Sequence, residues 1–266
     1  MTEKYEKLIE IISGFGSAAV AFSGGVDSTL LLYAAKEALG EHAAAVTISS
    51  GLCPGSEIAE AKDFCEKLGV KHIMLQVDAL KINSIRENPK DRCYYCKKDI
   101  FTKMKEIAAN IGAKEVLEGS NVDDLGDYRP GMKAIQELEI KSPLKEAGLT
   151  KAEIRELSKK FGLPTWNKPS AACLASRIPY GEEITKEKLD MVDKAESFLK
   201  RLGFVQLRVR IHGKLARIEL MPEDMERFMS EDVRSRVQKE FKNIGLSYTA
   251  LDIKGYRTGS LNEVLS

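Results

Sequence analysis

The first 160 residues alternate between short apolar runs and longer segments with helical spacing. Runs of four to six consecutive apolar residues are typical of strands buried on both faces of a parallel sheet. Strands that alternate with helices predict an α/β fold with a parallel sheet covered by helices on both faces. The expected strands are 18–22, 43–48, 71–77 and 115–117, and the expected helices are 4–13, 27–39, 56–68, 97–111 and 150–161.

The pattern changes after Pro164. Residues 164–181 contain three prolines and the only tryptophan, with few periodic positions, which predicts an ordered but irregular loop. The rest is typical of a small α+β domain, so we expect a first domain at 1–172 and a second at 173–266. Its expected elements are a helix at 186–201, strands at 204–210 and 215–220 joined by a hairpin turn at His212-Gly213, a helix near 222–242 and a strand near 247–253.

The first strand-to-helix connection carries a glycine-rich loop, Ser-Gly-Gly-Val-Asp-Ser at residues 23–28. Two glycines let the backbone approach an anion without a Cβ in the way. Ser28 and Thr29 present N–H groups at the positive end of the following helix, where a phosphate is stabilised. The loop lacks the lysine of a Walker A motif and adds Asp27, which favours a pyrophosphate held by backbone, hydroxyls and a metal. The alternative is a turn that merely requires glycine.

Charge and composition exclude several function classes. Lys plus Arg number 41 and Asp plus Glu 40, so the net charge of +1 gives no global electrostatic basis for binding nucleic acid or membranes. The start of the chain is too charged for a signal peptide, and no apolar run reaches the roughly 18 residues of a membrane span. We therefore expect a cytoplasmic protein. Five cysteines without an export signal indicate reduced thiols rather than a disulfide framework.

Three of these cysteines stand in informative positions. Cys93 and Cys96 form a C-x-x-C pair, expected on a turn, whose sulfurs can converge on one metal or cluster edge. The second C-x-x-C that a zinc ribbon requires is missing. Together with Cys173 the pair suits a 4Fe-4S cluster with one iron left open. The alternatives are a structural or redox pair and a packed core cysteine, and Cys53 and Cys65 are expected to be structural.

Two further polar patterns are candidates for ligand binding. Residues 119–124 and 127–131 follow the strand at 115–117, so they lie at the carboxyl edge of the sheet, where such folds bind ligands. Their carboxylates suit Mg²⁺ and Arg129 suits a phosphate, although a polar turn-rich loop is the alternative. Arg208 and Arg210 point to one face of a strand and form a two-armed anion clamp, unless that face is only solvated.

Taken together, these motifs resemble the PP-loop ATP pyrophosphatases. With the 23–28 loop, the segments C-Y-Y-C-K-K, D-D-x-x-D-Y-R-P-G, A-C-L-A-S-R-I-P-Y-G and R-V-R-x-H-G-x-x-A-R-I-E resemble, over nearly the whole chain, the ATP-dependent sulfur transferases that make the nickel-pincer nucleotide cofactor of lactate racemase. The resemblance implies a Rossmann-like sheet of the adenine nucleotide α hydrolase-like type, ATP, Mg²⁺ and adenylation with release of pyrophosphate. It also implies the substrate pyridinium-3,5-biscarboxylic acid mononucleotide, whose carboxylates become thiocarboxylates.

The same resemblance assigns the site. In one branch of the family the residue matching Cys173 gives up its own sulfur and becomes dehydroalanine. In the other branch three cysteines hold a 4Fe-4S cluster that carries a transferable sulfide, and Cys93 and Cys96 favour this branch here. Cluster ligands are then Cys93, Cys96 and Cys173; catalytic candidates are Cys173, Asp27, Arg208, Arg210, Glu196, Glu219 and Lys97; nucleotide-binding candidates are Ser23, Gly24, Gly25, Asp27, Ser28, Gly119, Asp124, Arg129, Ser176 and Arg177.

Other functions remain open at this point. A tRNA thiolase with the same loop would need an RNA-binding surface, against which the net charge of +1 speaks weakly. A sensor that binds a nucleotide or cluster without turnover is a second alternative. An amidotransferase-like synthetase would lack its glutaminase domain and leave the cysteines without a role. We expect a small nucleotide as substrate, no nucleic acid or membrane partner, and a homo-oligomer.

Overall fold

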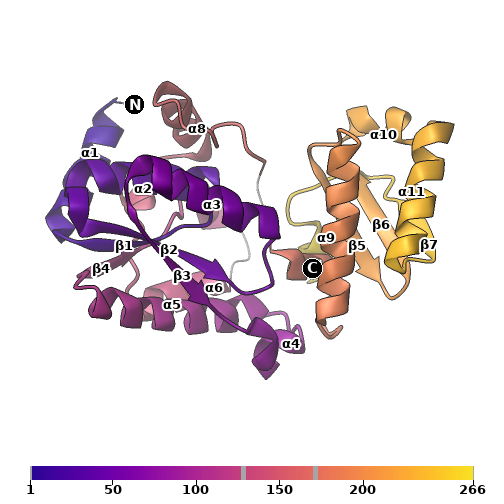
Figure 1. The fold of residues 1–266 in the computed structure, drawn as a ribbon, viewed down its shortest axis with the longest axis horizontal. Helices are drawn as coiled ribbons and strands as arrows, with labels where there is room; N and C mark the ends of the chain where they lie inside the picture. Colours follow the sequence, from indigo (N-terminus) through magenta and orange to yellow (C-terminus); the bar gives the residue numbers. More distant parts are fainter. Residues whose placement is uncertain (1, 127–129, 170–172, 266) are drawn as a thin grey trace. The chain divides into compact units, whose positions relative to one another are not determined.

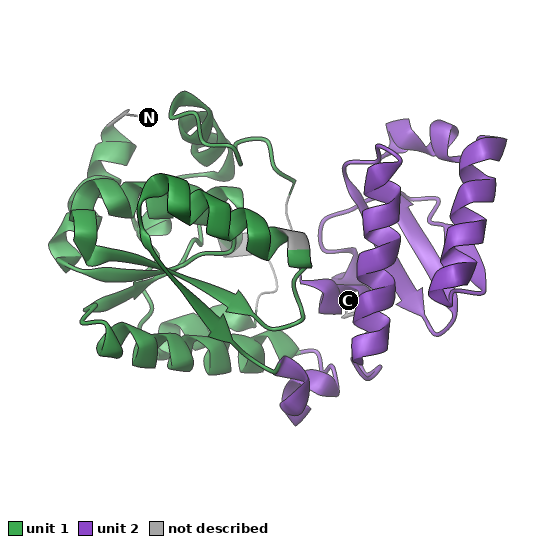
Figure 2. Cartoon of the chain, viewed as in Figure 1, with its two compact units in different colours: residues 1–78, 91–171 green, residues 79–90, 172–266 purple. Residues whose placement is uncertain are grey.

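The computed structural model describes residues 2–126, 130–169 and 173–265. The chain divides into two compact units, coloured separately in Figure 2. The first unit comprises residues 1–78 and 91–171, and the second comprises residues 79–90 and 172–266. The short excursion at 79–90 therefore belongs to the second unit although it lies in the sequence of the first.

The first unit is built on a parallel four-stranded sheet with the order β3-β2-β1-β4 (Figure 1). Ala18 pairs with Ala43 on one side and with Glu115 on the other, so β1 is central. The predicted parallel sheet is confirmed, and its strands are continuous apolar runs because both faces are covered. The strands are β1 (Ala18–Ala21), β2 (Ala43–Ser49), β3 (Lys71–Gln76) and β4 (Glu115–Leu117).

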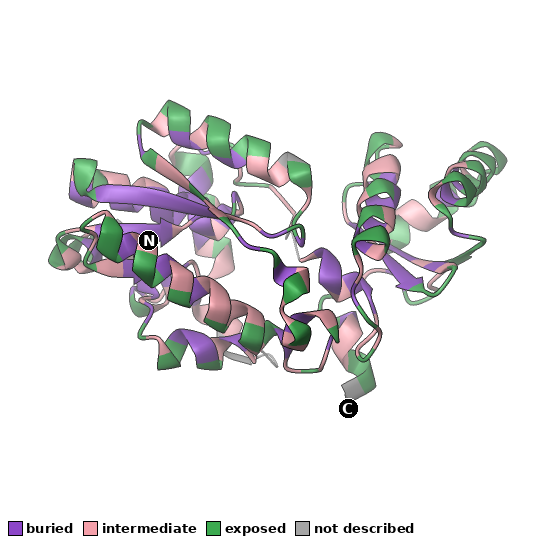
Figure 3. Cartoon of the chain, turned by 60° about the horizontal axis from the view of Figure 1, so that its bottom comes forward, coloured by how far each residue is buried: buried purple, intermediate pink, exposed green. Residues whose placement is uncertain are grey.

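Helices cover both faces of this sheet, and the alternation of side chains along β1 separates two cores. Ala18 and Val20 pack in one core with residues of α1, α2, α3, α7 and α8, whereas Ala19 packs in the other with residues of α5 and α6. The strands are buried and the helices expose their outer faces (Figure 3). The helices are α1 (Thr2–Phe15), α2 (Val26–Leu39), α3 (Gly55–Leu68), α5 (Arg92–Asn110), α6 (Gly131–Glu137), α7 (Pro143–Glu146) and α8 (Lys151–Lys160).

The second unit carries a three-stranded sheet with the order β5-β6-β7. The predicted hairpin is confirmed: β5 and β6 are antiparallel and turn at Gly213, whose φ of 58° suits glycine. Strand β7 pairs with β6 in parallel. The elements are α4 (Asn83–Arg86), α9 (Lys186–Arg201), β5 (Leu207–His212), β6 (Leu215–Leu220), α10 (Pro222–Phe228), α11 (Glu231–Ile244) and β7 (Tyr248–Leu251).

Two expected elements of this unit are wrong in detail. The single helix expected at 222–242 is two helices, because Ser230 adopts extended backbone (φ −59°, ψ 148°) before the acidic first turn of α11. The strand expected from 204 begins at Leu207. Phe204 is nevertheless fully buried, so its apolar character reports core packing rather than strand structure.

The 79–90 segment is fastened to the second unit by Asn88. This residue is completely buried and has a left-handed backbone (φ 55°), which asparagine tolerates better than most residues. Its side-chain amide donates to the carbonyl oxygens of Ile178 at 3.2 Å, Pro179 at 2.7 Å and Glu182 at 3.2 Å. The backbone oxygen of Asn88 also accepts from the N–H of Gly181. One buried amide therefore holds the 178–182 loop.

Membrane insertion finds no support in the helices. Within residues 2–126, 130–169 and 173–265, none of them is both long enough and apolar enough to cross a bilayer.

Helix α2 contributes three consecutive leucines to the larger core, and Leu31 is completely buried there. Leu31→Ala removes buried methyl groups and leaves a cavity, so we expect the free energy of unfolding of the first unit to fall by about 2–5 kcal/mol. Urea denaturation followed by circular dichroism measures this. Met74→Ala on β3, where the side chain is 36% exposed, is the matched control and should change the unfolding free energy much less. Equal losses in both variants would contradict this assignment of the core.

Candidate functional site

The 23–28 loop connects the carboxyl end of β1 to the start of α2. Gly24 has a left-handed backbone (φ 70°) and packs against α3, where an added Cβ would lie 3.6 Å from the carbonyl oxygen of Glu57. The hydroxyls of Ser23 and Ser28 lie 3.1 Å apart, and that of Ser28 also donates to the Gly25 carbonyl at 3.1 Å. The loop thus presents backbone and hydroxyl groups at the positive end of a 14-residue helix, an arrangement suited to phosphate.

Asp27 is the centre of a polar network beside this loop. Its carboxylate accepts from the ammonium group of Lys151 and, at 3.2 Å, from the side-chain amide of Asn121. The backbone N–H of Lys151 donates to Asp123 at 2.7 Å, and the N–H of Asp123 donates to the Asn121 side chain at 2.9 Å. The network joins the end of β4 to the start of α8 and places a cation next to the loop, which has no lysine of its own.

Sequence reasoning missed Lys151. A signal was present, because Thr150 and Glu153 form a capping box that marks the start of α8 at Lys151. Such a position lies at a helix amino terminus, and in a parallel α/β sheet the amino termini of the helices face the ligand-binding edge.

Lys168 is a second cation at the loop that the sequence did not reveal. Its ammonium group donates to the Gly24 carbonyl at 3.1 Å and pairs with Glu57 at 2.8 Å and Glu60 at 2.7 Å. Burial acts to lower the pKa of Lys168, but the hydrogen bonds and charges of the two glutamates outweigh it and raise the pKa. The lysine therefore stays charged and ties the loop to α3.

Gly119, just after β4, approaches the loop from the other side. A Cβ added there would lie 3.2 Å from the backbone nitrogen of Ser28 and 3.3 Å from the Cβ of Asp27. Asp124 accepts from the N–H of Asn121 at 3.0 Å and so shapes the same connection. Arg129, predicted to face a phosphate, lies outside the described residues. The structure therefore brings Gly119 to the loop and places Asp124 in the neighbouring turn.

The C-x-x-C pair lies on a helix, so the expected turn is wrong. Helix α5 begins at Arg92 rather than at 97, and Cys93 and Cys96 occupy its first turns, where a spacing of three residues puts them on one face. Cys93 is exposed and Cys96 half-buried. Because α6 starts directly against this stretch, a Cβ on Gly131 would come within 2.6 Å of the Cδ of Lys97. The glycine of the D-Y-R-P-G motif is thus a close-approach position.

Cys173 belongs to the second unit, whereas Cys93 and Cys96 belong to the first. Their grouping as cluster ligands stays a prediction. Among the described residues, no set of three or more His, Cys, Asp or Glu side chains is arranged to hold a metal ion. The backbone carbonyl of Cys173 accepts from the hydroxyl of Ser176 at 2.7 Å and from the guanidinium of Arg177 at 3.0 Å. These two residues therefore order the backbone at Cys173.

The remaining two cysteines differ from each other. Cys65 is completely buried in the core, and burial raises the pKa of its thiol to about 12. It behaves as a packed apolar residue, as expected. Cys53 is exposed in the connection between β2 and α3 and therefore does not contribute to the core.

The second unit contains two buried ion pairs among the predicted site residues. Arg177 bonds both oxygens of Glu196, at 2.8 and 2.9 Å, and Arg210 bonds both oxygens of Glu219, at 2.5 and 3.1 Å. All four side chains are at most 7% exposed. Glu196 also accepts from the N–H of Val209 on β5 at 3.0 Å. Such pairs are stable only when their hydrogen bonds are made, so this charged cluster has a defined geometry.

Arg208 is the other arm of the predicted anion clamp. Its guanidinium lies 5.2 Å from the centre of the Tyr256 ring and donates to the tyrosine hydroxyl at 3.4 Å. Burial lowers the pKa of Arg208, and the nearby charge of Arg177 lowers it further. The strand places Arg208 and Arg210 on one face, as predicted, but Arg210 is paired with Glu219.

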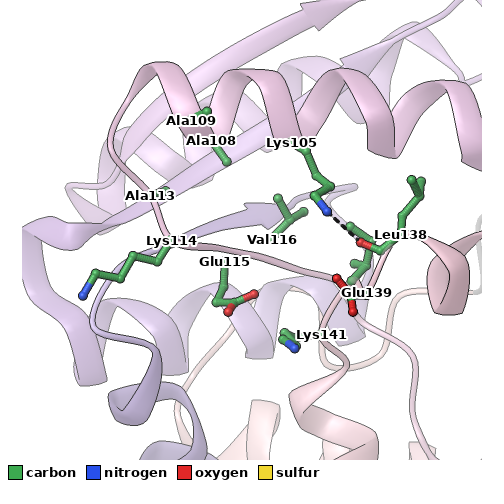
Figure 4. Close-up of a pocket in the computed structure, with 11 residues that line it drawn as sticks. Lys105, Ala108, Ala109, Ala113, Lys114, Glu115, Val116, Leu138, Glu139 and Lys141 are labelled. Atoms are coloured by element: carbon green, nitrogen blue, oxygen red, sulfur yellow. Dashed lines mark hydrogen bonds between the residues drawn. The ribbon is translucent and has the colours of Figure 1, made fainter.

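A cavity of about 390 Å³ lies elsewhere, beside β4 between the end of α5 and residues 138–141 (Figure 4). Its lining includes Lys105, Lys114 and Lys141, and Lys105 donates to the Leu138 carbonyl at 3.1 Å. None of the predicted site residues lines it. The candidate site at the 23–28 loop is thus defined by its polar network rather than by the depth of a pocket.

Comparisons with known proteins agree with this geometry. A family model described as queuosine biosynthesis protein QueC matches residues 17–89, which include the loop. An uncharacterised protein of Synechocystis sp. is 41% identical over 100% of this chain and 99% of its own length. Pyridinium-3,5-bisthiocarboxylic acid mononucleotide synthase of Lactiplantibacillus plantarum is 36% identical over 100% of this chain and 96% of its own. A glutamine-hydrolysing GMP synthase polypeptide of Thermoplasma volcanium is 32% identical over 70% of this chain and 64% of its own. The chain therefore belongs to the PP-loop family of ATP-dependent sulfurtransferases.

Proposed function

We propose that this protein adenylates a carboxylate of pyridinium-3,5-biscarboxylic acid mononucleotide and converts it to a thiocarboxylate. The full-length similarity to the L. plantarum synthase is the observation that carries this proposal. The geometry of the 23–28 loop supports it, because the site must bind the phosphates of ATP before any carboxylate is activated.

A carboxylate is a poor acyl donor, so activation precedes sulfur transfer. The substrate carboxylate attacks the α-phosphorus of ATP, and pyrophosphate leaves. The loop N–H groups, the start of α2 and the ammonium group of Lys151 stabilise charge on the departing pyrophosphate. Lys168 holds the Gly24 carbonyl and so keeps the loop in place. Asp27 offers a hard oxygen donor beside the loop and would hold Mg²⁺, which neutralises phosphate charge.

The acyl-adenylate then has AMP as its leaving group. A sulfur nucleophile attacks the carbonyl carbon, the C–O bond to the adenylate breaks, and AMP departs with the electron pair. Three thiolates suit a 4Fe-4S cluster held by Cys93, Cys96 and Cys173, which would supply the sulfide when bound. In the alternative, Cys173 gives up its own sulfur. Ser176 and Arg177, which bond the Cys173 carbonyl, orient this residue in either route.

The second unit provides substrate orientation in this scheme. Arg208 and Arg210 bind the phosphate of the mononucleotide, while Glu196 and Glu219 fix the arginine cluster through buried ion pairs. Fixing the phosphate end lowers the entropic cost of bringing the carboxylate to the adenylation site. Lys97 on α5 contributes positive charge near the activated carboxylate. We expect the enzyme to act as a homo-oligomer on this small substrate.

The products of ATP cleavage test the proposal most directly. With the mononucleotide substrate, we expect AMP and pyrophosphate in equal amounts and a thiocarboxylate product, resolved by chromatography and mass spectrometry. Asp27→Asn removes the carboxylate charge beside the loop and should lower kcat/KM by about 100-fold. Asp63→Asn, on an exposed pair with Lys67, is the matched control and should retain activity. Release of ADP and orthophosphate by the unaltered protein would sink the proposal.

The close approach at Gly119 gives a second test. Gly119→Ala places a methyl group against the backbone nitrogen of Ser28, so we expect the KM for ATP to rise by about tenfold, a loss near 1.4 kcal/mol. Gly14→Ala, where an added Cβ meets nothing within 4 Å, is the control, and the better helix propensity of alanine should leave the protein as stable or slightly more so. Steady-state kinetics and thermal melts of both variants decide. An unchanged KM in Gly119→Ala would mean that this contact does not shape the nucleotide site.

The cysteines separate the two sulfur sources. If a cluster supplies the sulfide, Cys93→Ala or Cys96→Ala abolishes repeated turnover and the visible absorbance obtained by anaerobic reconstitution with iron and sulfide. Cys53→Ala removes an exposed cysteine outside the trio and should change neither. If Cys173 is the donor, intact-protein mass spectrometry after turnover shows one loss of hydrogen sulfide per chain, with no cluster required. That result would reject the cluster route.

A further inference from the structure

Residues 252–263, the stretch that follows β7, pack against the arginine-bearing hairpin of the second unit. We call it the 252–263 segment. Gly255 has a left-handed backbone (φ 70°), and an added Cβ would come within 2.7 Å of the Leu220 carbonyl. The N–H of Tyr256 donates to that same carbonyl at 2.7 Å. The segment is therefore docked tightly onto the end of β6.

Beyond this anchor the segment contacts both arginines of the predicted clamp. The ring of Tyr256 lies under the guanidinium of Arg208, with 5.2 Å between the guanidinium carbon and the ring centre. The hydroxyl of Ser260, which is 6% exposed, lies 2.5 Å from the Nη2 atom of Arg210. The same hydroxyl lies 3.0 and 3.1 Å from the two carboxylate oxygens of Glu219.

The hydrogen-bond roles at Ser260 follow from the chemistry of its partners. A guanidinium can only donate and an ionised carboxylate can only accept, so the Ser260 hydroxyl accepts from Arg210 and donates to Glu219. Because Arg210 already bonds Glu219 directly, the three side chains close a ring. Removing the hydroxyl leaves a buried donor and a buried acceptor short of one partner each, which is costly at charged groups.

The charges around this ring favour an anionic ligand. Three guanidinium groups share the cluster with two carboxylates, which leaves one net positive charge, and the nearby Arg217 is offset by Asp252. Burial lowers the pKa of Arg208, and Arg177 adds to this effect, so placing this cation here costs free energy that a bound anion would return. The three guanidinium groups belong to Arg177, Arg208 and Arg210, and the two carboxylates to Glu196 and Glu219.

We propose that the 252–263 segment is an integral part of the substrate site, in which Tyr256 and Ser260 are positioning residues that hold Arg208 and Arg210 for the phosphate group of the nucleotide substrate. The proposal rests on the proposed function for the identity of that nucleotide, but the anion site itself does not depend on sulfur transfer. The segment then sets substrate affinity and leaves the chemistry of the first unit unchanged.

Four variants in the full-length protein test these roles. Ser260→Ala and Tyr256→Leu should each raise the KM for the mononucleotide, and the Kd of inorganic phosphate measured by isothermal titration calorimetry, by about tenfold. Ser260→Thr keeps a hydroxyl and Tyr256→Phe keeps the ring, so each should recover most of that loss. The KM for ATP should change by less than about twofold in all four, because the 23–28 loop belongs to the other unit.

Asn262→Ala is the matched control, since Asn262 lies in the same segment and its side-chain oxygen accepts from the Tyr180 hydroxyl at 3.0 Å. It should leave both the phosphate Kd and the mononucleotide KM unchanged. If Asn262→Ala weakens phosphate binding as much as Ser260→Ala does, the segment is only structural and the proposal is overturned. Equal increases in the KM values for ATP and mononucleotide would overturn it in the same way.

Failure of the proposed function is distinguishable from failure of this inference. If the unaltered protein makes no thiocarboxylate but binds phosphate, and Ser260→Ala and Tyr256→Leu weaken that binding, the anion site stands and only the substrate identity is wrong. If the unaltered protein binds no phosphate, or both variants bind it as tightly as the unaltered protein does, the inference is wrong whatever reaction is catalysed.

Discussion

The close approach of three backbone segments at the start of α2 is the constraint on which the candidate site depends. Gly24 turns the chain through a left-handed conformation against α3, and Gly119 brings the end of β4 to within contact of the Ser28 nitrogen. Only where side chains are absent can the backbone surround an anion this closely. The parallel sheet serves this purpose, because it delivers β1 and β4 side by side to the same edge.

Charge reaches this edge from distant parts of the chain. The 23–28 loop has no lysine, yet Lys151 on α8 pairs with Asp27 and Lys168 contacts the Gly24 carbonyl. These cations are correctly placed only after the first unit has folded, so phosphate binding is coupled to tertiary structure rather than to a local motif. In the second unit, buried arginine–glutamate pairs impose a comparable rigidity, since neither partner can be left alone in a low-dielectric environment.

The sequence predicted the parts of this protein in which local pattern and tertiary environment agree. Buried strands and the hairpin were placed within a few residues, and the loop was recognised from its glycines. The start of α5 was missed because Arg92 to Cys96 carry no apolar periodicity, and the break at Ser230 was missed because the flanking residues are good helix formers. Lys151 and Lys168 lie more than 100 residues from their partners, so local patterns contain no information about those pairs.

Asn88 has a consequence for how the chain reaches its native state. It supplies hydrogen bonds to carbonyls 90 to 94 positions later, so the smaller unit is assembled from two stretches with most of the larger unit's sequence between them. Closing so long a loop is entropically expensive and slow compared with forming local contacts. During synthesis on the ribosome, the 79–90 stretch must therefore wait for its partner to emerge, and a fragment starting at residue 173 would lack the amide around which its own 178–182 loop is organised.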